Sequence, residues 1–413
     1  MSGTNACVRV LYSFPHKLGA DTICYTAWQQ VTCLAGAGAD VLVFPGVLHR
    51  PVPANVKVRP TLAWGKLRVS YRLLGSRRAF ALHDWIVSRR LEKLAGQIDI
   101  IHTWPQGALR TLRIAARLGI PTVMERPGAH IRFVYEATQR EHERLGLPWA
   151  RGEEYKPSQE VLDIEEEEMR LADYLLCPSD FALKTFADQG LPKEKLVRHQ
   201  YGYDETIHYP DSRPRNSDGG LTMLFVGYSG LIKGLHYALE AWLQSPAHRT
   251  GRFLVVGTFT PEYARKFSSL LAHPSISVLG RRTDVPDLMR KSDILVLPSI
   301  AEGSALVTSE ARGCGCVLLV SDGAGASCAH MEEGLVHHAG DTHALAQHIT
   351  MLHEDRALLE RLRAASLRTV PEITWTAAGV KLLQVYREII AARSAGMLSE
   401  TDRTPAALSL KSW

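Results

Sequence analysis

Short apolar segments alternate with amphipathic stretches along most of the chain. Ten of these segments are four to six residues long and rich in Val, Ile and Leu, a pattern typical of strands buried on both faces of a parallel sheet. Amphipathic stretches such as 106–118 and 179–189 predict helices between them. Strands and helices in alternation indicate an α/β fold. The ten predicted strands are 8–12, 40–44, 98–102, 122–125, 174–177, 221–226, 252–256, 276–279, 294–297 and 317–320.

The alternation predicts two doubly wound, Rossmann-like domains, which suits a length of 413 residues. A polar segment with Pro and Gly, 211–220, separates an N-terminal domain, 1–210, from a C-terminal domain, 221–372. A last helix is expected within 373–395, and the small and polar tail, 396–413, is predicted to be disordered. Parallel sheets bind ligands beyond the carboxyl ends of their strands, so two facing sheets predict a deep cleft.

Composition indicates a globular protein of the cytoplasm. The chain is 46% apolar and 22% charged, and it holds no run of 18 or more apolar residues that would predict a transmembrane helix. Its first residues predict a strand rather than a signal peptide. Seven cysteines without framework spacing predict free, buried thiols in a reducing compartment.

The net charge of +5 is unevenly distributed. Residues 62–96 hold eight Lys and Arg against two acidic residues, together with Trp64, Trp85 and other apolar side chains. Such a segment predicts a surface that docks on an anionic membrane. It is equally consistent with a solvated helix whose aromatic residues fill the core. Without basic and aromatic residues interleaved on a strand platform, no nucleic-acid partner is expected.

The strongest candidate site follows the predicted strand 294–297. Glu302 stands at the carboxyl end of that strand, and Glu310 falls on the second turn of a helix expected from about Leu306. Two carboxylates beside free amides suit a ligand with both hydroxyls and phosphate, such as a nucleotide sugar. Solvated charges at a helix end are the other interpretation of this spacing. The amides predicted to be free belong to Gly303, Ser304, Ala305 and Leu306.

A second candidate lies between the predicted strand 221–226 and the next helix. Here Gly227 and Gly230 precede Lys233 and Gly234. Glycines let the backbone approach a phosphate, and a lysine supplies a cation where a diphosphate leaving group develops charge. A purely structural strand-to-helix turn explains the first two glycines equally well.

The segment from Glu302 to Glu310 resembles the Glu-x7-Glu signature of retaining glycosyltransferases of family four, which have the GT-B fold. The resemblance extends from about residue 8 to about residue 391 and is closest in the C-terminal half. It implies two Rossmann-like domains facing each other across a cleft and a last helix that packs on the N-terminal domain. It also implies a nucleotide-diphosphate sugar as donor, no separate cofactor, and retention by front-face attack.

The same resemblance assigns roles to individual residues. Lys233 matches the lysine of the family's phosphate clamp, but Tyr228 and Ile232 stand where family members place the clamp arginine. Gly19 is the single glycine of a segment similar to the family's N-terminal glycine loop, and a plain turn explains it as well. His130 matches the histidine that the family directs at the transferred sugar, although a histidine of the core or surface is the default interpretation.

The sequence therefore predicts transfer of a hexose-type sugar to a hydroxyl acceptor, with Glu302, His130 and Lys233 as the catalytic residues. The expected acceptor is a glycan or lipid-linked precursor of the cell envelope or of a polysaccharide, which the N-terminal domain would bind at the inner face of the membrane. The alternative is a nucleotide-sugar-binding protein with little turnover, because the clamp arginine is missing. No metal is expected, since no Asp-x-Asp follows a strand and Cys314 and Cys316 have no second Cys or His pair nearby.

Overall fold

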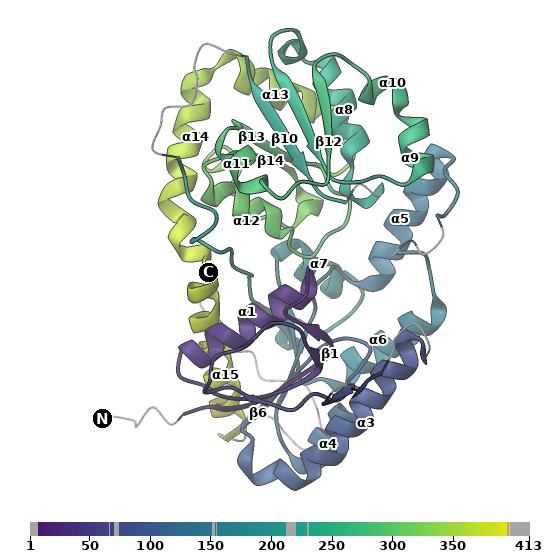
Figure 1. Ribbon diagram of the computed structural model, residues 1–413, viewed down its shortest axis with the longest axis vertical. Helices are drawn as coiled ribbons and strands as arrows, with labels where there is room; N and C mark the ends of the chain where they lie inside the picture. The colour runs from purple at the N-terminus through teal and green to yellow at the C-terminus, as the bar shows by residue number, and fades with distance from the viewer. Residues whose placement is uncertain are drawn as a thin grey trace.

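The computed structural model describes residues 7–65, 67–69, 74–150, 153, 155–211, 220–228, 231–394 and 396. Two parallel sheets, one in each half of the chain, are flanked by helices and stacked end to end along the long axis of the molecule (Figure 1). This is the GT-B architecture expected from the sequence. Most of the predicted linker and all of the predicted tail except Gly396 lie outside the described residues.

The N-terminal sheet has the strand order β3-β2-β1-β6-β7-β8-β9, and every neighbouring pair is parallel. Its strands are β1 (Arg9–Leu18), β2 (Asp40–Leu48), β3 (Lys57–Val58), β6 (Ile100–Thr103), β7 (Thr122–Glu125), β8 (Tyr174–Cys177) and β9 (Leu196–Arg198). A short antiparallel hairpin, β4 (Ala63–Trp64) and β5 (Leu67–Arg68), stands apart from it.

The C-terminal sheet has the order β12-β11-β10-β13-β14-β15 and is also parallel throughout. Its strands are β10 (Thr222–Val226), β11 (Arg252–Val256), β12 (Ile276–Gly280), β13 (Ile294–Leu297), β14 (Val317–Ser321) and β15 (Gly334–His337). All ten predicted strands are present. The sequence missed the edge strands β3, β9 and β15 and the two-residue strands β4 and β5, in which the apolar run is too short to be recognised.

Helices cover both faces of each sheet. In the first half they are α1 (Ile23–Gly36), α3 (Ser76–Leu94), α4 (Leu109–Leu118), α5 (Ile131–Leu145), α6 (Gln159–Leu171) and α7 (Asp180–Asp188). In the second half they are α8 (Leu235–Gln244), α9 (Pro261–Lys266), α10 (Ser268–Leu271), α11 (Val285–Arg290), α12 (Leu306–Gly313), α13 (Thr342–Glu354), α14 (Arg356–Thr369) and α15 (Trp375–Ser394).

Two expectations need correction. The helix predicted from residue 106 begins at Leu109, because Gln106 has a positive φ of 66° and the amides of Gln106 and Ala108 donate to the Glu168 carboxylate. All seven cysteines are free, but Cys7 is exposed and Cys24, Cys33 and Cys328 are only partly buried.

The last helix, α15, leaves the C-terminal domain and packs on α1 of the N-terminal domain (Figure 1). Leu382, Leu383 and Ile389 of α15 join the apolar cluster that contains the buried side of β1. The Tyr386 hydroxyl hydrogen-bonds the His102 imidazole Nδ1 at 2.6 Å, inside the same core. Helix α15 therefore completes the N-terminal core.

Gly379 sets how closely α15 approaches α1. A Cβ at this position would lie 2.4 Å from the Cys33 Cβ. We expect Gly379→Ala to lower the free energy of unfolding by about 1–3 kcal/mol through overpacking, although Ala is the better helix former by about 1 kcal/mol. Urea unfolding followed by circular dichroism measures the change. A variant as stable as or more stable than the parent would show that the two helices can separate at no cost.

Candidate active site

The carboxyl ends of the two sheets meet between the domains. Glu302 lies in the loop after β13, Gly227 follows β10, and the loop after β7 comes towards them from the N-terminal domain. The backbones of the two domains come into contact at Gly303, where an added Cβ would lie 2.0 Å from the Pro127 carbonyl oxygen. Only a glycine permits this approach of backbone to backbone. The loop that carries His130 therefore lies directly against the segment that carries Glu302.

Lys233 and Glu302 form an ion pair at this edge. The Lys233 Nζ lies 2.6 Å from the Glu302 Oε1, and the Ser299 hydroxyl donates to the same oxygen at 2.7 Å. The side chains are 23% and 13% exposed, so the pair is shielded from water but still accessible to a ligand. A Cβ added to Gly227 would meet the Lys233 Cδ and Cε at 3.8 Å. The structure thus brings Gly227, Lys233 and Glu302 together.

The segment before α12 offers amides, although fewer than predicted. The Ala305 N–H donates to the Ala324 carbonyl at 3.4 Å, so it is not free. The N–H groups of Gly303, Ser304 and Leu306 have no hydrogen-bond partner within the described part of the chain. Three donors therefore remain at the N-terminus of α12, where the helix dipole favours an anion.

Glu310 lies on the second turn of α12, as predicted, and is only partly exposed. Its carboxylate has no hydrogen bond or ion pair to any described residue. Burial without a compensating partner raises the pKa of Glu310 to about 7. This carboxylate is therefore available to accept hydroxyl hydrogens from a ligand.

His130 caps the N-terminus of α5 and is 2% exposed. Its Nδ1 accepts the Arg132 N–H at 3.2 Å, so the proton of the neutral ring resides on Nε2. Burial, and then the nearby cations Arg126 and Arg132, lower the pKa of His130 to about 4. At neutral pH this side chain is an uncharged hydrogen-bond donor.

Gly19 has a structural explanation of its own. It has a φ of +87°, and a Cβ there would lie 2.3 Å from the Arg50 Cβ. Two residues later, Asp21 lies 3.8 Å from the exposed guanidinium of Arg281, which belongs to the loop after β12. The Gly19 loop therefore faces the C-terminal domain. No hydrogen bond or ion pair of the described chain joins Gly19 or Glu310 to the Lys233–Glu302 pair.

Tyr228 and Ile232, at one of whose positions family members place the clamp arginine, lie in different surroundings. Tyr228 is 58% exposed, whereas Ile232 is 8% exposed and packs with Ala129 and Ala301 between the domains. An arginine at 232 would have to enter that apolar contact. The described residues of this loop thus supply one cation, Lys233.

Sequence reasoning missed two polar residues next to the site. Ser299 orients Glu302 through the hydrogen bond described above, and Arg126 lies buried directly after β7. The Arg126 Nη2 pairs with the Glu165 carboxylate at 2.5 Å, while its Nε and Nη1 have no partner in the described structure. Only their positions in the sequence could have indicated Ser299 and Arg126, because each follows a predicted strand.

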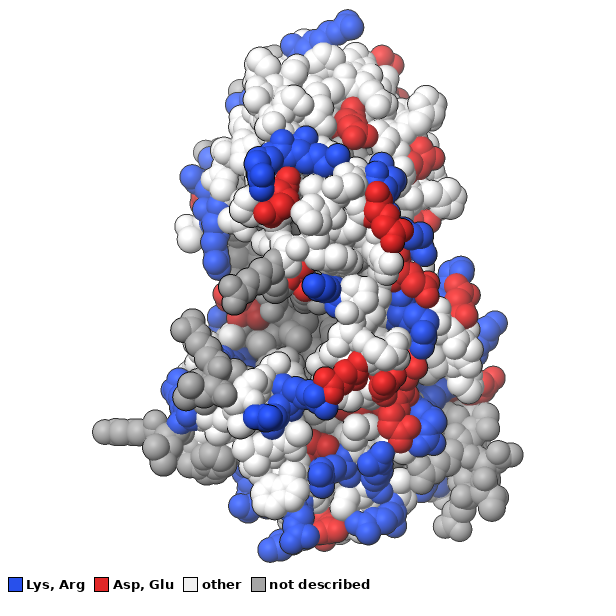
Figure 2. All heavy atoms as spheres, turned by 90° about the vertical axis from the view of Figure 1, so that its right-hand side faces the viewer, with Lys and Arg blue, Asp and Glu red and all other residues white. Residues whose placement is uncertain are grey.

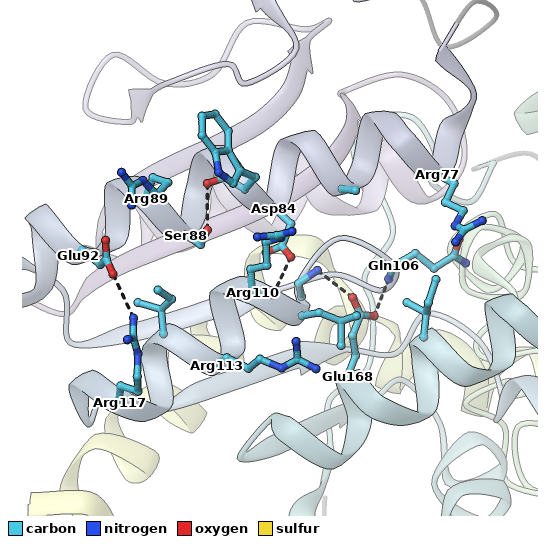
Figure 3. Close-up of a pocket in the computed structure, with 16 residues that line it drawn as sticks. Arg77, Asp84, Ser88, Arg89, Glu92, Gln106, Arg110, Arg113, Arg117 and Glu168 are labelled. Atoms are coloured by element: carbon cyan, nitrogen blue, oxygen red, sulfur yellow. Dashed lines mark hydrogen bonds and ion pairs between the residues drawn. The ribbon is translucent and has the colours of Figure 1, made fainter.

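A separate cavity of about 780 Å³ lies between α3, α4 and α6 (Figure 3). The carboxylates of Asp84 and Glu168 face it, but both accept hydrogen bonds from amides at the start of α4. Arg117 pairs with Glu92 at 3.1 Å. The arginines that line the cavity are Arg77, Arg89, Arg110, Arg113 and Arg117.

The basic segment 62–96 is only partly the surface that the sequence predicted. Leu62, Phe80 and Leu91 are buried in the core, whereas Trp85 is 48% exposed. The apolar face of α3 thus covers the sheet, and its arginines point outward. Figure 2 shows basic side chains gathered over the lower end of the N-terminal domain, where α3 and α4 lie. Lys66 and the segment 70–73, which includes Arg72, are outside the described residues.

No helix in the described ranges is long and apolar enough to cross a membrane. No group of three or more His, Cys, Asp or Glu side chains among those same residues could hold a metal ion.

Comparison with known proteins gives partial matches in sequence. Residues 220–355 match the family model described as Glycosyl transferases group 1. The chain is 24% identical over 281 residues to the UDP-Gal:alpha-D-GlcNAc-diphosphoundecaprenol alpha-1,3-galactosyltransferase of Escherichia coli. The matched segment covers 63% of this chain and 67% of that protein. The chain is 28% identical over 118 residues to the N,N'-diacetylbacillosaminyl-diphospho-undecaprenol alpha-1,3-N-acetylgalactosaminyltransferase of Campylobacter jejuni, covering 28% and 31%. The matched part of the chain thus spans between about a third and two thirds of the length of these two relatives.

Solved structures match over nearly the whole length. A sucrose-phosphate synthase from Thermosynechococcus elongatus superposes with a TM-score of 0.68 at 18% identity, covering 94% of this chain and all of that one. HepE from Anabaena in complex with UDP and glucose gives 0.59 at 16% identity, with coverage of 92% and 99%. At such identities the likeness shows the fold alone.

The unpaired carboxylate of Glu310 predicts a measurable pH dependence of stability. An acid whose pKa is raised by folding binds more protons in the native state, so its contribution to stability falls as pH rises from about 4.5 to about 7. We expect Glu310→Gln to raise the free energy of unfolding at pH 8 by about 1–3 kcal/mol and to leave it nearly unchanged at pH 4. Urea unfolding at the two pH values measures this.

Glu302→Gln is the matched control, because Glu302 is paired with Lys233. This substitution removes one partner of an ion pair and is not expected to stabilise the protein at pH 8. Equal behaviour of the two variants would show that Glu310 has a partner in solution.

Proposed function

Because the chain belongs to the glycosyl transferases group 1 family of GT-B proteins, we propose that it transfers a hexose-type sugar from a nucleotide-diphosphate sugar to a hydroxyl acceptor, with retention of configuration. The observation that carries this proposal is the Lys233–Glu302 ion pair, held at the carboxyl edge of one sheet and facing the His130 loop of the other. A cation and an acceptor carboxylate thus lie where the loop that leads to His130 meets the C-terminal domain.

Each of these groups has a role in the proposed reaction. Lys233, with the amides of Gly303, Ser304 and Leu306, stabilises the charge that develops on the departing diphosphate. Glu302 accepts hydroxyl hydrogens of the donor sugar. The Nε2–H of His130 donates to a hydroxyl of the same sugar. In the reaction the bond from the anomeric carbon to the diphosphate breaks, the acceptor oxygen bonds to that carbon on the same face, and the departing phosphate takes the acceptor proton.

Glu310 is proposed to bind the nucleoside. An ionised carboxylate accepts two hydroxyl hydrogens at once, as the vicinal pair of a ribose requires. The absence of any other described partner for this side chain supports the assignment. Binding would then compensate the desolvation of a carboxylate that the unliganded protein leaves unpaired.

A nucleotide-sugar-binding protein with little turnover is the second candidate. The observation that favours it is the replacement of the clamp arginine by an exposed tyrosine and a buried isoleucine, at positions 228 and 232. One cation stabilises a leaving diphosphate less than two do. Turnover, rather than binding, therefore distinguishes the two candidates.

A screen of nucleotide sugars, run in the presence of a chelator, tests the proposal. We expect transfer to persist in chelator, since the proposed reaction uses no metal. Lys233→Ala should lower kcat on the order of 10²-fold, because it removes the cation that faces the leaving group. Tyr228→Ala is the matched control in the same loop and should change kcat little. Binding without transfer for every donor would establish the second candidate, and loss of transfer in chelator would contradict the metal-free mechanism.

The proposed acceptor is a lipid-linked glycan precursor, and the protein would act in the cytoplasm, docked on the inner face of the membrane. The Escherichia coli and Campylobacter jejuni relatives carry diphosphoundecaprenol in their names. The arginine-lined cavity between α3 and α4 and the exposed Trp85 support a docking role for this end of the N-terminal domain. Because the apolar face of α3 is buried, the docking would be largely electrostatic.

Sedimentation with anionic vesicles tests this docking. Arg89 and Arg110 line the cavity, are exposed and have no ion pair with a described residue. Each basic side chain near such a surface contributes roughly 1 kcal/mol, so Arg89→Glu with Arg110→Glu should weaken binding by tenfold or more, to order of magnitude. The control is the same charge change on the other domain, Arg249→Glu with Lys266→Glu. Equal losses for the two pairs, or no pelleting of the parent at low salt, would leave a soluble acceptor as the better hypothesis.

A further inference from the structure

Helix α5 belongs to the N-terminal half of the sequence but packs on the C-terminal domain along its length. Figure 1 shows it rising from the lower domain to the level of α9. In its first turns, Val134 and Ala137 pack with Ile232 and Ala301 of the C-terminal domain. At its other end, Leu145 packs against the C-terminal core. His130 caps this same helix.

Glu141 forms the polar centre of this contact and is 6% exposed. Its Oε1 lies 2.7 Å from the His236 Nε2, and the Tyr237 hydroxyl donates to the carboxylate at 2.9 Å. Arg144 completes the cluster at 2.6 Å from Glu141, with its guanidinium 5.0 Å from the centre of the Tyr237 ring. Removing one member of such a buried group leaves its partners desolvated and unpaired. The cluster therefore holds α5 on the C-terminal domain.

The Glu141 carboxylate stays ionised at neutral pH. Burial opposes ionisation of Glu141, but hydrogen bonds from His236, Arg144 and Tyr237 outweigh it and lower the pKa of Glu141 to about 2. On its other side, the His236 Nδ1 lies 3.1 Å from the Tyr263 hydroxyl. The imidazole thus bridges Glu141 of one domain to Tyr263 of the other.

The partners of Glu141 lie next to the candidate catalytic lysine. His236 and Tyr237 are in the first turn of α8, which starts directly after Lys233 and Gly234. The first turns of α5 also contact the short helical turn that ends at Lys233. One end of α5 therefore begins at His130, in the loop whose Pro127 carbonyl lies against Gly303, while its side is attached to the segment that contains Lys233.

We propose that Glu141 is a positioning residue that holds His130 opposite the Lys233–Glu302 pair by fastening α5 to α8. It touches none of the reacting groups itself. As a consequence α5 moves with the C-terminal domain, and His130 keeps its place relative to the donor site when the domains move. The catalytic part of this inference rests on the proposed glycosyl transfer, whereas the attachment of α5 does not.

Hydrogen–deuterium exchange tests the attachment without any substrate. In Glu141→Leu the amides of α5 should exchange at least about tenfold faster than in the parent, because local opening no longer breaks the buried cluster. Glu136→Leu is the matched control, since Glu136 lies on the exposed face of the same helix and, among the described residues, pairs only with Arg140. Tyr237→Phe removes one donor from the other side and should give an intermediate change if Glu141→Leu fails to fold. Unchanged exchange in both Glu141→Leu and Tyr237→Phe would overturn the attachment.

A double-mutant cycle on kcat tests the positioning role. Glu141→Leu and His130→Ala should each lower kcat by about tenfold or more, because small misplacements of a catalytic group are costly. The double variant should be no slower than the slower single variant, since both lose the same correctly placed imidazole. The affinity for UDP, used as a probe of the C-terminal site, should change by less than about twofold.

The outcomes of the two experiments are distinguishable. Multiplicative losses in the cycle, or a fall in UDP affinity that matches the fall in kcat, would overturn the positioning role and indicate general damage. If the parent transfers no sugar from any donor, the proposed function fails, while the exchange measurement still decides whether Glu141 fastens α5.

Discussion

The close contact between Gly303 and the Pro127 carbonyl determines how the candidate active site is assembled. Backbone meets backbone there, so no side chain separates the two domains at that point. The loop that leads to His130 consequently lies against the loop that carries Glu302, and Ile232 fills the apolar space beside them. Because Ile232 is the residue directly before Lys233, the same packing orients Lys233. A larger residue at 303 would separate all of these groups together.

The candidate site contains one ion pair and one carboxylate without a partner among the described residues. Lys233 and Glu302 neutralise each other at 2.6 Å, with Ser299 as a further donor. Glu310 has no such partner in the described structure, and its pKa is raised by burial. A protein selected only for stability would not keep an unpaired carboxylate in a partly buried position. The arrangement makes sense if a ligand with hydroxyl groups supplies the missing hydrogen bonds.

The two domains are joined by more than their linker. α15 runs from the C-terminal domain into the N-terminal core, and α5 runs the opposite way, from the N-terminal sheet onto α8. Each helix buries side chains in the domain to which it does not belong by sequence. Relative motion of the domains must therefore take place around these two crossings, and α5 connects such motion to the position of His130.

Local sequence determined the strands, the α/β class and the positions of most candidate residues. Continuous apolar runs mark strands covered on both faces, and ligands bind beyond the strand ends of parallel sheets, so position drew attention to Glu302. Lys233 and His130 also follow predicted strands, but the family resemblance singled them out. The edge strands β3, β9 and β15 could not be found from the sequence, because each carries at most two consecutive apolar residues. Tertiary structure alone decided that Ala305 is not a free donor, that the apolar face of α3 is buried, and that Glu141 meets His236, 95 residues away. These facts depend on which surfaces pack together, and packing between distant segments leaves no periodic trace in either of them.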